Sequence, residues 1–396
     1  MRLAIIGALL LSAGAVAVAA GALPMADLAA LIDRVAPILL FVVAMTVVTE
    51  LASEAGVFLW IARRLRHWGR GRSILLWLFL SAFATLSTIF LSLDTTAVLL
   101  TPVVVSVTRQ AGLPALPFAL TTVWLANTAS LLFPISNLTN LLAQHSLGGI
   151  SPASFAALMW APSLTAILVP LVFVGIVFRR SLRKRYSRIP VGRIRADQPG
   201  ASAATTDRVL LGASAIVLAL LLPALVSGIP VWIPAVAAAV VLALVYALRQ
   251  PRTLKLSLVP WSLLVFASGL FLVMETTRHL GASVLLSQWA GQGQDAPALL
   301  RLAAMGAVGS NLLNNLPAYL LAEPLAESPQ RMAALLVGVN AGPLITPWAS
   351  LATLLWHERL VRMNVIITWK GYALFGLIVA PVTVLGAVLA LAITQQ

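Results

Sequence analysis

The chain has 396 residues, of which 60% are hydrophobic and only 10% are charged, and its mean hydropathy is +0.99. Soluble domains carry roughly 25% charged residues, so the composition excludes an ordinary soluble protein and predicts a polytopic membrane protein. The formal net charge of +14 resides in short loops between apolar runs, where basic residues set membrane topology, so we do not expect a nucleic-acid partner.

The first apolar run covers residues 3–22 and is long enough to span a bilayer, so we interpret it as a retained first helix. A cleaved signal peptide is the alternative, because the run is rich in alanine and ends in small residues. A second span is expected over residues 28–49. A shorter segment over 53–66 leads into an arginine cluster, which predicts that the next loop is cytoplasmic.

Residues 73–91 and 96–108 flank a polar stretch, Ser92–Thr96. The two arms either are full spans or form a re-entrant hairpin over residues 73–110 with its tip near the midplane of the bilayer. Irregular backbone at that depth requires cover by protein or by a water-filled cavity, as at a binding site. Asp94 is a functional candidate, because an aspartate at the centre of a membrane costs ~2.5–3.5 kcal/mol on insertion scales.

Residues 115–145 are too long and too polar in the middle for one continuous helix. We therefore expect two half-helices with a break between Asn127 and Asn137, where freed backbone groups can bind a solute or an ion. Residues 155–178 then return the chain to the cytoplasmic side.

A loop over residues 179–208 carries nine Lys or Arg residues, so we predict that it is cytoplasmic and that it links two halves of the chain. The second half repeats the order of elements in the first. Its expected elements are spans over 209–227, 231–248 and 258–277, a hairpin over 297–328, a broken helix over 331–356 and a last span over 371–393.

The polar segments of the two halves match without a gap, and the aligned pairs are Asn127 with Asn340, Pro134 with Pro347, Asn137 with Ser350 and Asn140 with Thr353. Paired helix-breaking segments of this kind indicate a transporter site where two repeats meet. Because matching elements have opposite predicted orientation, we expect two inverted repeats, residues 1–178 and 209–396. The predicted fold class is an all-α polytopic membrane protein with about 9–12 membrane segments, each repeat containing a re-entrant hairpin and a broken helix.

Four motifs carry a family resemblance: LDTTAVLLTPVVV, ANTASLLFPISNLTNLLA, SNLLNNLPAYLL and GPLITPWASLATLLW. With them the chain resembles the arsenite efflux permeases, or arsenical pump membrane proteins, of the ion-transporter superfamily, which also includes sodium/proton antiporters and dicarboxylate carriers. The resemblance covers most of the chain. It implies an inner-membrane carrier with scaffold and transport regions, proton-coupled extrusion of arsenite or antimonite and, for some members, a cytoplasmic arsenite-stimulated ATPase as partner.

Three positions depart from the family pattern. Arsenite permeases usually have one acidic residue at the position of Asn127, another at that of Asn340, and a lysine at that of Leu344. The hairpin acid Asp94 is kept, together with Glu54. The motifs therefore support membership of the superfamily more strongly than they support arsenite as the substrate.

Arsenite near neutral pH is an uncharged trihydroxide that donates and accepts hydrogen bonds, and a chain without cysteine must hold it with amides and hydroxyls. For each such residue taken alone, the alternative is hydrogen bonding between helices. The expected helix breaks are Pro134, Pro317, Pro343 and Pro347. The candidate substrate-binding residues are Asn127, Ser130, Ser136, Asn137, Asn140, Asn311, Asn314, Asn315, Asn340, Thr346, Ser350 and Thr353.

Asp94 is the expected proton carrier, because protonation of a carboxyl group in a dry site can be coupled to the side on which the site is open. The alternative is that Asp94 caps a half-helix. Glu50, Glu54 and Glu275 are interpreted as solvated residues at a membrane interface.

The sequence shows no phosphate-binding loop, metal-ligand set or catalytic triad, so we expect no cofactor, no metal and no enzymatic activity. The main hypothesis is efflux of arsenite or antimonite driven by the proton motive force. The alternative is a sodium/proton antiporter or a sodium-coupled, dicarboxylate-type anion carrier on the same scaffold. The expected partners are the lipid bilayer, a small inorganic solute, the ATPase implied by the resemblance and a second copy in a homodimer. The N-terminus is predicted to be cytoplasmic and the C-terminus periplasmic.

Overall fold

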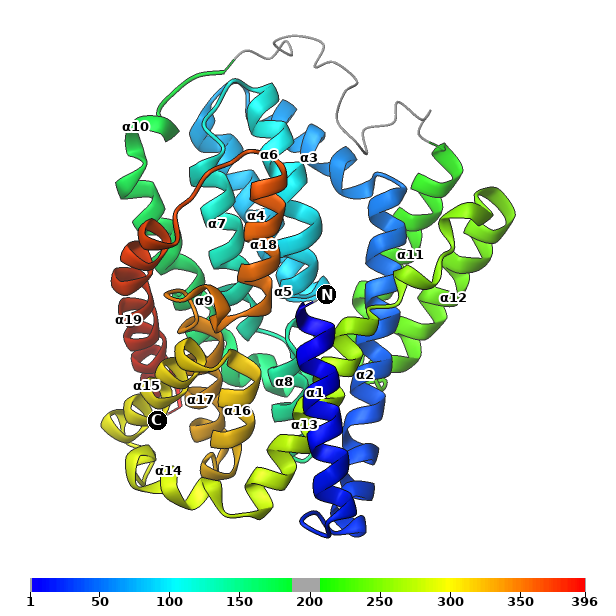
Figure 1. Cartoon of the computed structure of the whole chain (residues 1–396). Helices are drawn as coiled ribbons and strands as arrows, with labels where there is room; N and C mark the ends of the chain where they lie inside the picture. The colour runs from blue at the N-terminus through cyan, green and yellow to red at the C-terminus, as the bar shows by residue number, and fades with distance from the viewer. Residues whose placement is uncertain (1, 187–206, 396) are drawn as a thin grey trace.

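The structure is a computed structural model that describes residues 2–186 and 207–395, and within them the chain is helical and contains no β-sheet (Figure 1). Residues 187–206, most of the predicted basic linker, lie outside the described part. The expected all-α polytopic membrane fold is confirmed. Six of the described helices are long and apolar enough to cross a membrane, namely α2 (Met25–Glu54), α4 (Ser73–Leu91), α9 (Pro152–Val177), α11 (Arg208–Val226), α12 (Trp232–Arg249) and α19 (Trp369–Thr394).

The helices form two groups that lie side by side (Figure 1). The α2 group contains α2, α11 and α12 together with α1 (Arg2–Ala19) and α13 (Trp261–His279). The hairpin group contains two hairpins and two broken helices, packed with α9 and α19. The remaining short helices are α3 (Val57–Trp68), α10 (Arg179–Leu182), η4 (Pro251–Thr253), η5 (Leu256–Leu258) and α14 (Ala282–Ala290).

Helices α1 and α13 approach one another through glycines. A Cβ atom on Gly7 would overlap the backbone of Phe266, and one on Gly269 would overlap the backbone of Leu11. Small residues allow this close backbone approach, which replaces the hydrophobic driving force that is missing between helices in lipid.

Each hairpin turns at a polar residue with positive φ. In the first, α4 ends at Leu91, the chain turns at Ser92 (φ 111°), and it continues through α5 (Leu93–Thr95), the π-helix η1 (Thr96–Leu100) and α6 (Thr101–Gln110). In the second, α15 (Ala296–Leu312) precedes Asn314 (φ 148°), α16 (Asn315–Ala322) and η6 (Glu323–Leu325). Figure 1 shows the first hairpin in the upper half of the molecule and the second in the lower half, which favours re-entrant arms over full spans.

Both predicted broken helices are interrupted at their polar segments. The first consists of α7 (Leu116–Thr128), η2 (Ala129–Leu131), η3 (Pro134–Ser136) and α8 (Leu138–Ser146). The second consists of α17 (Pro329–Ala341), η7 (Pro347–Ala349) and α18 (Leu351–Arg362). The aligned residues Asn137 and Ser350 have the same extended backbone, with φ of −152° and −143°, immediately before α8 and α18.

One expected break is displaced. Pro317 lies inside α16, and the hairpin turns earlier, at Leu313 and Asn314. Proline is tolerated in the first turn of a helix because its missing N–H has no intrahelical partner there. Pro134, Pro343 and Pro347 do lie in the interrupted segments.

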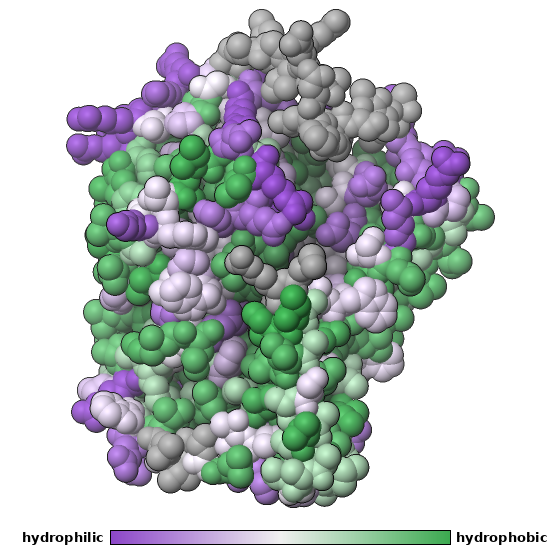
Figure 2. Space-filling model, in the orientation of Figure 1, coloured by the Kyte–Doolittle hydropathy of each residue, from purple (hydrophilic) through white to green (hydrophobic). Residues whose placement is uncertain are grey.

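The surface has the polarity of a membrane protein. Figure 2 shows hydrophobic residues over the flanks and many hydrophilic residues at the upper end. Large apolar side chains such as Leu220, Ile176 and Leu374 are 62–70% exposed. An apolar belt of this kind faces lipid, so the chain is a multi-pass membrane protein.

Candidate functional site

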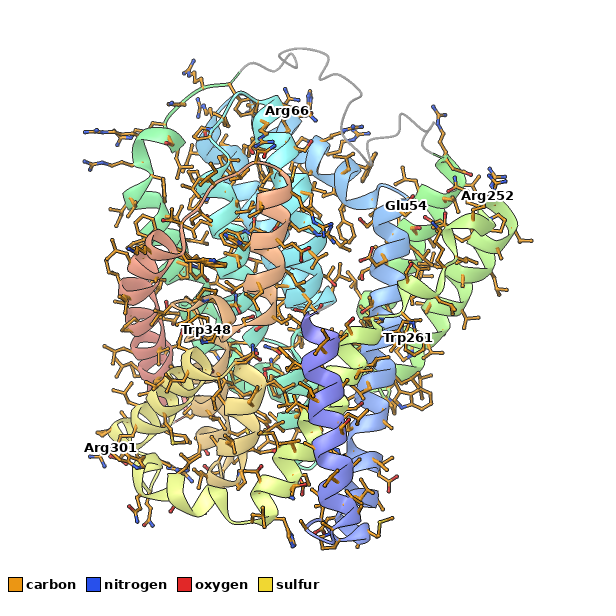
Figure 3. All side chains as sticks on the ribbon, in the orientation of Figure 1. Glu54, Arg66, Arg252, Trp261, Arg301 and Trp348 are labelled. Carbon is orange, nitrogen blue, oxygen red and sulfur yellow. The ribbon has the colours of Figure 1, made fainter. Side chains whose placement is uncertain are left out.

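A cavity of about 510 Å³ lies between the α2 group and the hairpin group. Its walls are α2, the tip of the first hairpin, the first helix break, the segment that leads into α13, and α18. Figure 3 shows Trp261, which lines the cavity, and Trp348 of η7 at the middle height of the molecule, far from both ends. The polar lining residues are Thr46, Thr49, Glu50, Ser92, Asp94, Thr95, Asn137, Ser257 and Ser262.

The hydroxyl groups at the tip of the first hairpin form hydrogen bonds within the hairpin, and Asp94 lines the cavity. Ser92 Oγ accepts a hydrogen bond from Thr95 N (3.3 Å), so Ser92 caps the short helix α5. The alternative interpretation, in which Asp94 is the cap, is therefore wrong. Thr96 Oγ1 donates to Ser87 Oγ (3.0 Å) on α4. Among the described residues, the carboxylate of Asp94 has neither a hydrogen-bond donor nor an ion-pair partner, which leaves it available to a proton or a solute.

The two broken helices are joined by a buried amide cluster. Asn340 Oδ1 accepts from Asn137 Nδ2 (2.9 Å) and from Thr139 Oγ1 (2.9 Å), and Asn340 Nδ2 donates to Asn140 Oδ1 (2.7 Å). Asn140 Nδ2 in turn donates to Ser130 O (2.7 Å). Asn140 and Asn340 thus bond one helix to another, which is the alternative role considered for them, while Asn137 also faces the cavity.

Asn127, the residue of the first half that aligns with Asn340, forms no corresponding cluster among the described residues. Asn127 Nδ2 donates to Val123 O (2.9 Å) within its own helix, and Ser130 Oγ donates to Asn127 O (2.7 Å). Asn127 Oδ1 and Ser350 Oγ are buried without a hydrogen-bond partner among the described residues. Ser350 and Thr353 stand in the second half where Asn137 and Asn140 stand in the first. Their side chains are shorter, so Asn127 forms fewer hydrogen bonds than Asn340.

The second hairpin is attached to the second break by its own asparagines. Asn311 Nδ2 donates to Gly342 O (2.9 Å), and Asn311 Oδ1 accepts from Thr346 N (3.0 Å). Asn314 Nδ2 donates to Trp348 O (2.8 Å). These side chains hold backbone together, and none of them lines the cavity.

Of the predicted site residues, the structure brings only Asp94 and Asn137 to the cavity wall. Ser136 is buried and donates to Ile89 O (2.8 Å), which ties the first break to the first hairpin. Asn315 and Thr353 are buried in the hairpin group, away from the cavity lining.

Sequence reasoning missed the contribution of α2. Thr46, Thr49 and Glu50 line the cavity, so Glu50, which was expected only at a membrane interface, belongs to the site as well. Their spacing of three and four positions places them on one face of a helix, and this pattern in an otherwise apolar span was the available signal.

A charged cluster joins the two groups near the lower end of their boundary. Arg34 of α2 forms an ion pair with Glu323, and the two side chains are only 16% and 10% exposed. Ser146 and Tyr319 also donate hydrogen bonds to Glu323 Oε1, the latter at 3.0 Å. The cavity begins further along α2, at Leu39, on the upper side of this cluster.

Comparison with known proteins places the chain among membrane transporters. Residues 2–353 match the family model described as citrate transporter. The chain is 28% identical over 385 residues to the arsenical pump membrane protein of Escherichia coli, covering 91% of this chain and 87% of the relative. It is 28% identical over 362 residues to that of Yersinia enterocolitica, covering 85% and 81%. The crystal structure of the Alcanivorax borkumensis YdaH transporter has the same fold, with a TM-score of 0.59 at 17% identity and coverage of 92% and 86%.

Proposed function

The chain belongs to the citrate transporter family and is a membrane transporter, and from this premise we propose that it extrudes arsenite or antimonite, as neutral hydroxides, across the inner membrane in exchange for protons. The relatives named arsenical pump membrane proteins span more than four fifths of this chain, which supports the choice of solute.

The observation that carries the proposal is the donor set of the cavity. Its polar lining consists of hydroxyls, one amide and two carboxylates, and contains no Lys or Arg. Hydroxyls and amides both donate and accept hydrogen bonds, as a neutral trihydroxide requires. A citrate-like anion would lie next to Asp94 and Glu50 with no Lys or Arg in the lining, so the lining disfavours an anion carrier.

We assign the proton to Asp94 and the contact with the solute to Asn137. Asn137 donates a hydrogen bond to Asn340 of the other broken helix, so a solute that binds the Asn137 amide also affects the second half of the chain. In this scheme the remaining candidate residues support the breaks, and the transporter uses the proton motive force without a cofactor. The basic upper end faces the cytoplasm, where an ATPase can dock, and the C-terminus, which lies in the lower half of the molecule, faces the periplasm. A homodimer fits the same scheme.

The test is transport into everted vesicles with an imposed pH gradient. We expect the wild-type chain to accumulate arsenite and Asp94→Asn to lose the accumulation, because an amide cannot carry the proton. Asp295→Asn is the matched control, since Asp295 is an exposed residue before α15. Unchanged uptake in Asp94→Asn, with normal protein levels, would refute proton coupling through this residue.

A sodium/proton antiporter is the second candidate, and one observation favours it. Two carboxylates with nearby hydroxyl and amide oxygens are also a donor set for a hard cation. In the same vesicles, dissipation of the pH gradient by sodium salts, without arsenite accumulation, would select this function.

A further inference from the structure

A second cavity, of about 600 Å³, lies on the outside of the molecule between α3, α4 and α11. Trp60 and Leu86 in its wall are 49% and 56% exposed, so it is a groove on the outer surface. All its lining residues are apolar or small except two, Ser87 and Arg208. A groove of this composition on the flank of a membrane protein faces acyl chains.

The upper end of the groove is positively charged. Arg208 is exposed at the first residue of α11 and has no ion-pair partner among the described residues. Its neighbour Asp207 is engaged elsewhere, because it caps α11 and pairs with Arg249 at 3.1 Å. The guanidinium of Arg64 lies 5.4 Å from the ring centroid of Trp60. No Asp or Glu lines the groove.

We propose that this groove binds an anionic phospholipid, with one acyl chain along α4 and α11 and the headgroup phosphate at Arg208 and Arg64. Tryptophan and arginine together are typical of the membrane interface, and Figure 3 shows Arg66 of the same helix α3 at the upper end of the molecule. Inorganic phosphate would contact only the basic end of the groove and leave its apolar length empty. In a zwitterionic lipid the phosphate is already neutralised by the cationic group of the same headgroup. The combination of apolar length and basic end selects an anionic lipid.

The position of the groove gives the lipid a structural role. Its walls come from both groups of helices, α4 of the first hairpin on one side and α11 on the other. Phe90 lines the groove, and its ring centroid lies 5.6 Å from that of Phe133 in the first helix break. A bound acyl chain therefore contacts at once the α2 group and the hairpin arm α4, which leads to the tip that carries Asp94.

The experiment measures fluorescence quenching of Trp60 by phosphatidylglycerol brominated on its acyl chains, titrated into phosphatidylcholine vesicles that contain the full chain. Subtracting the signal of Trp60→Phe isolates this tryptophan from the other ten. We expect brominated phosphatidylglycerol to quench Trp60 at a lower mole fraction than brominated phosphatidylcholine. Arg208→Gln should raise the half-quenching fraction about fivefold, the effect of one basic residue at a charged membrane surface.

Two further variants separate the groove from general surface charge. Arg252→Gln is the matched control, because Arg252 is exposed at η4 on the same end and does not line the groove. Gly212→Leu fills the groove without a clash, since a Cβ there meets no atom within 4 Å, and should abolish the preference for phosphatidylglycerol. Equal quenching by the two lipids in the wild type, or equal shifts in Arg208→Gln and Arg252→Gln, would overturn the proposal.

Discussion

At the scale of single residues, the site depends on how each buried amide is satisfied. Asn340 makes three side-chain hydrogen bonds to the first broken helix, and Asn137 is the only one of its partners that also lines the cavity. Leaving a buried donor or acceptor unpaired costs about 1–3 kcal/mol. The amide cluster is therefore a stability element as well as a connection between halves.

This predicts that Asn340→Leu lowers the free energy of unfolding by about 2–4 kcal/mol, because Asn137, Thr139 and Asn140 each lose a partner. Asn315→Leu is the control, since the Asn315 side chain makes no hydrogen bond among the described residues and should cost less than about 1 kcal/mol. Thermal unfolding in detergent measures both. Equal stability of the two variants would contradict the role of the cluster.

At the scale of elements, close backbone contacts decide which helices can pair. Helix α1 can lie this close to α13 because Gly7, Gly14 and Gly269 have no side chains at the contact. The hairpins show a second local device: Ser92 and Asn314 adopt positive φ, and the side chain of each caps the helix that follows. At each tip, the hydrogen bond of the capping side chain thus compensates for the unfavourable backbone conformation of the same residue.

The α1–α13 contact predicts that Gly269→Ala destabilises the chain by roughly 1–3 kcal/mol, because the added methyl group overlaps the backbone of Leu11. Gly175→Ala on α9 is the control, as its Cβ would meet only the edge of Trp77 at 3.9 Å. Comparison of the two melting temperatures checks the prediction, and a similar small shift for both would disprove it.

At the scale of the whole molecule, the cavity lies at the boundary between two groups of helices. The ion pair between Arg34 and Glu323 joins the same two groups at the lower end. Alternating access requires this boundary to open on one side at a time, so the ion pair is in a position to keep the lower side closed. It joins residues 289 positions apart and is largely buried.

We therefore predict that Glu323→Gln opens the lower side more often. The natural chain has no cysteine, so Thr49→Cys in the cavity wall supplies a single thiol for a membrane-impermeant maleimide. Applied from the side that holds Glu323, the reagent should label the Glu323→Gln background at least roughly tenfold faster, since loss of 1.4 kcal/mol suffices for that factor.

Glu327→Gln serves as the control for the labelling experiment, because Glu327 is exposed and has no ion-pair partner among the described residues. Identical labelling rates in the two backgrounds would show that the ion pair does not close this side.

The sequence by itself determined the all-α membrane class. The six long apolar helices and the two interrupted polar segments lie in the expected ranges, whereas α1 and α13, over two further expected spans, are not among those six helices. The class and the expected ranges follow from features local in the chain: the length of an apolar run, and polar residues and prolines that cannot continue a helix in lipid. The inverted relation of the halves stays a prediction, in keeping with hairpins that occupy opposite ends of the molecule.

Only the tertiary structure decided which polar side chains face the cavity. Asn340 and Asn140 looked like binding residues, yet they bond to each other, whereas Glu50 looked like an anchor and lines the cavity. The reason is that the direction of a side chain depends on the neighbours its helix packs against, and here those neighbours come from about 200 residues away.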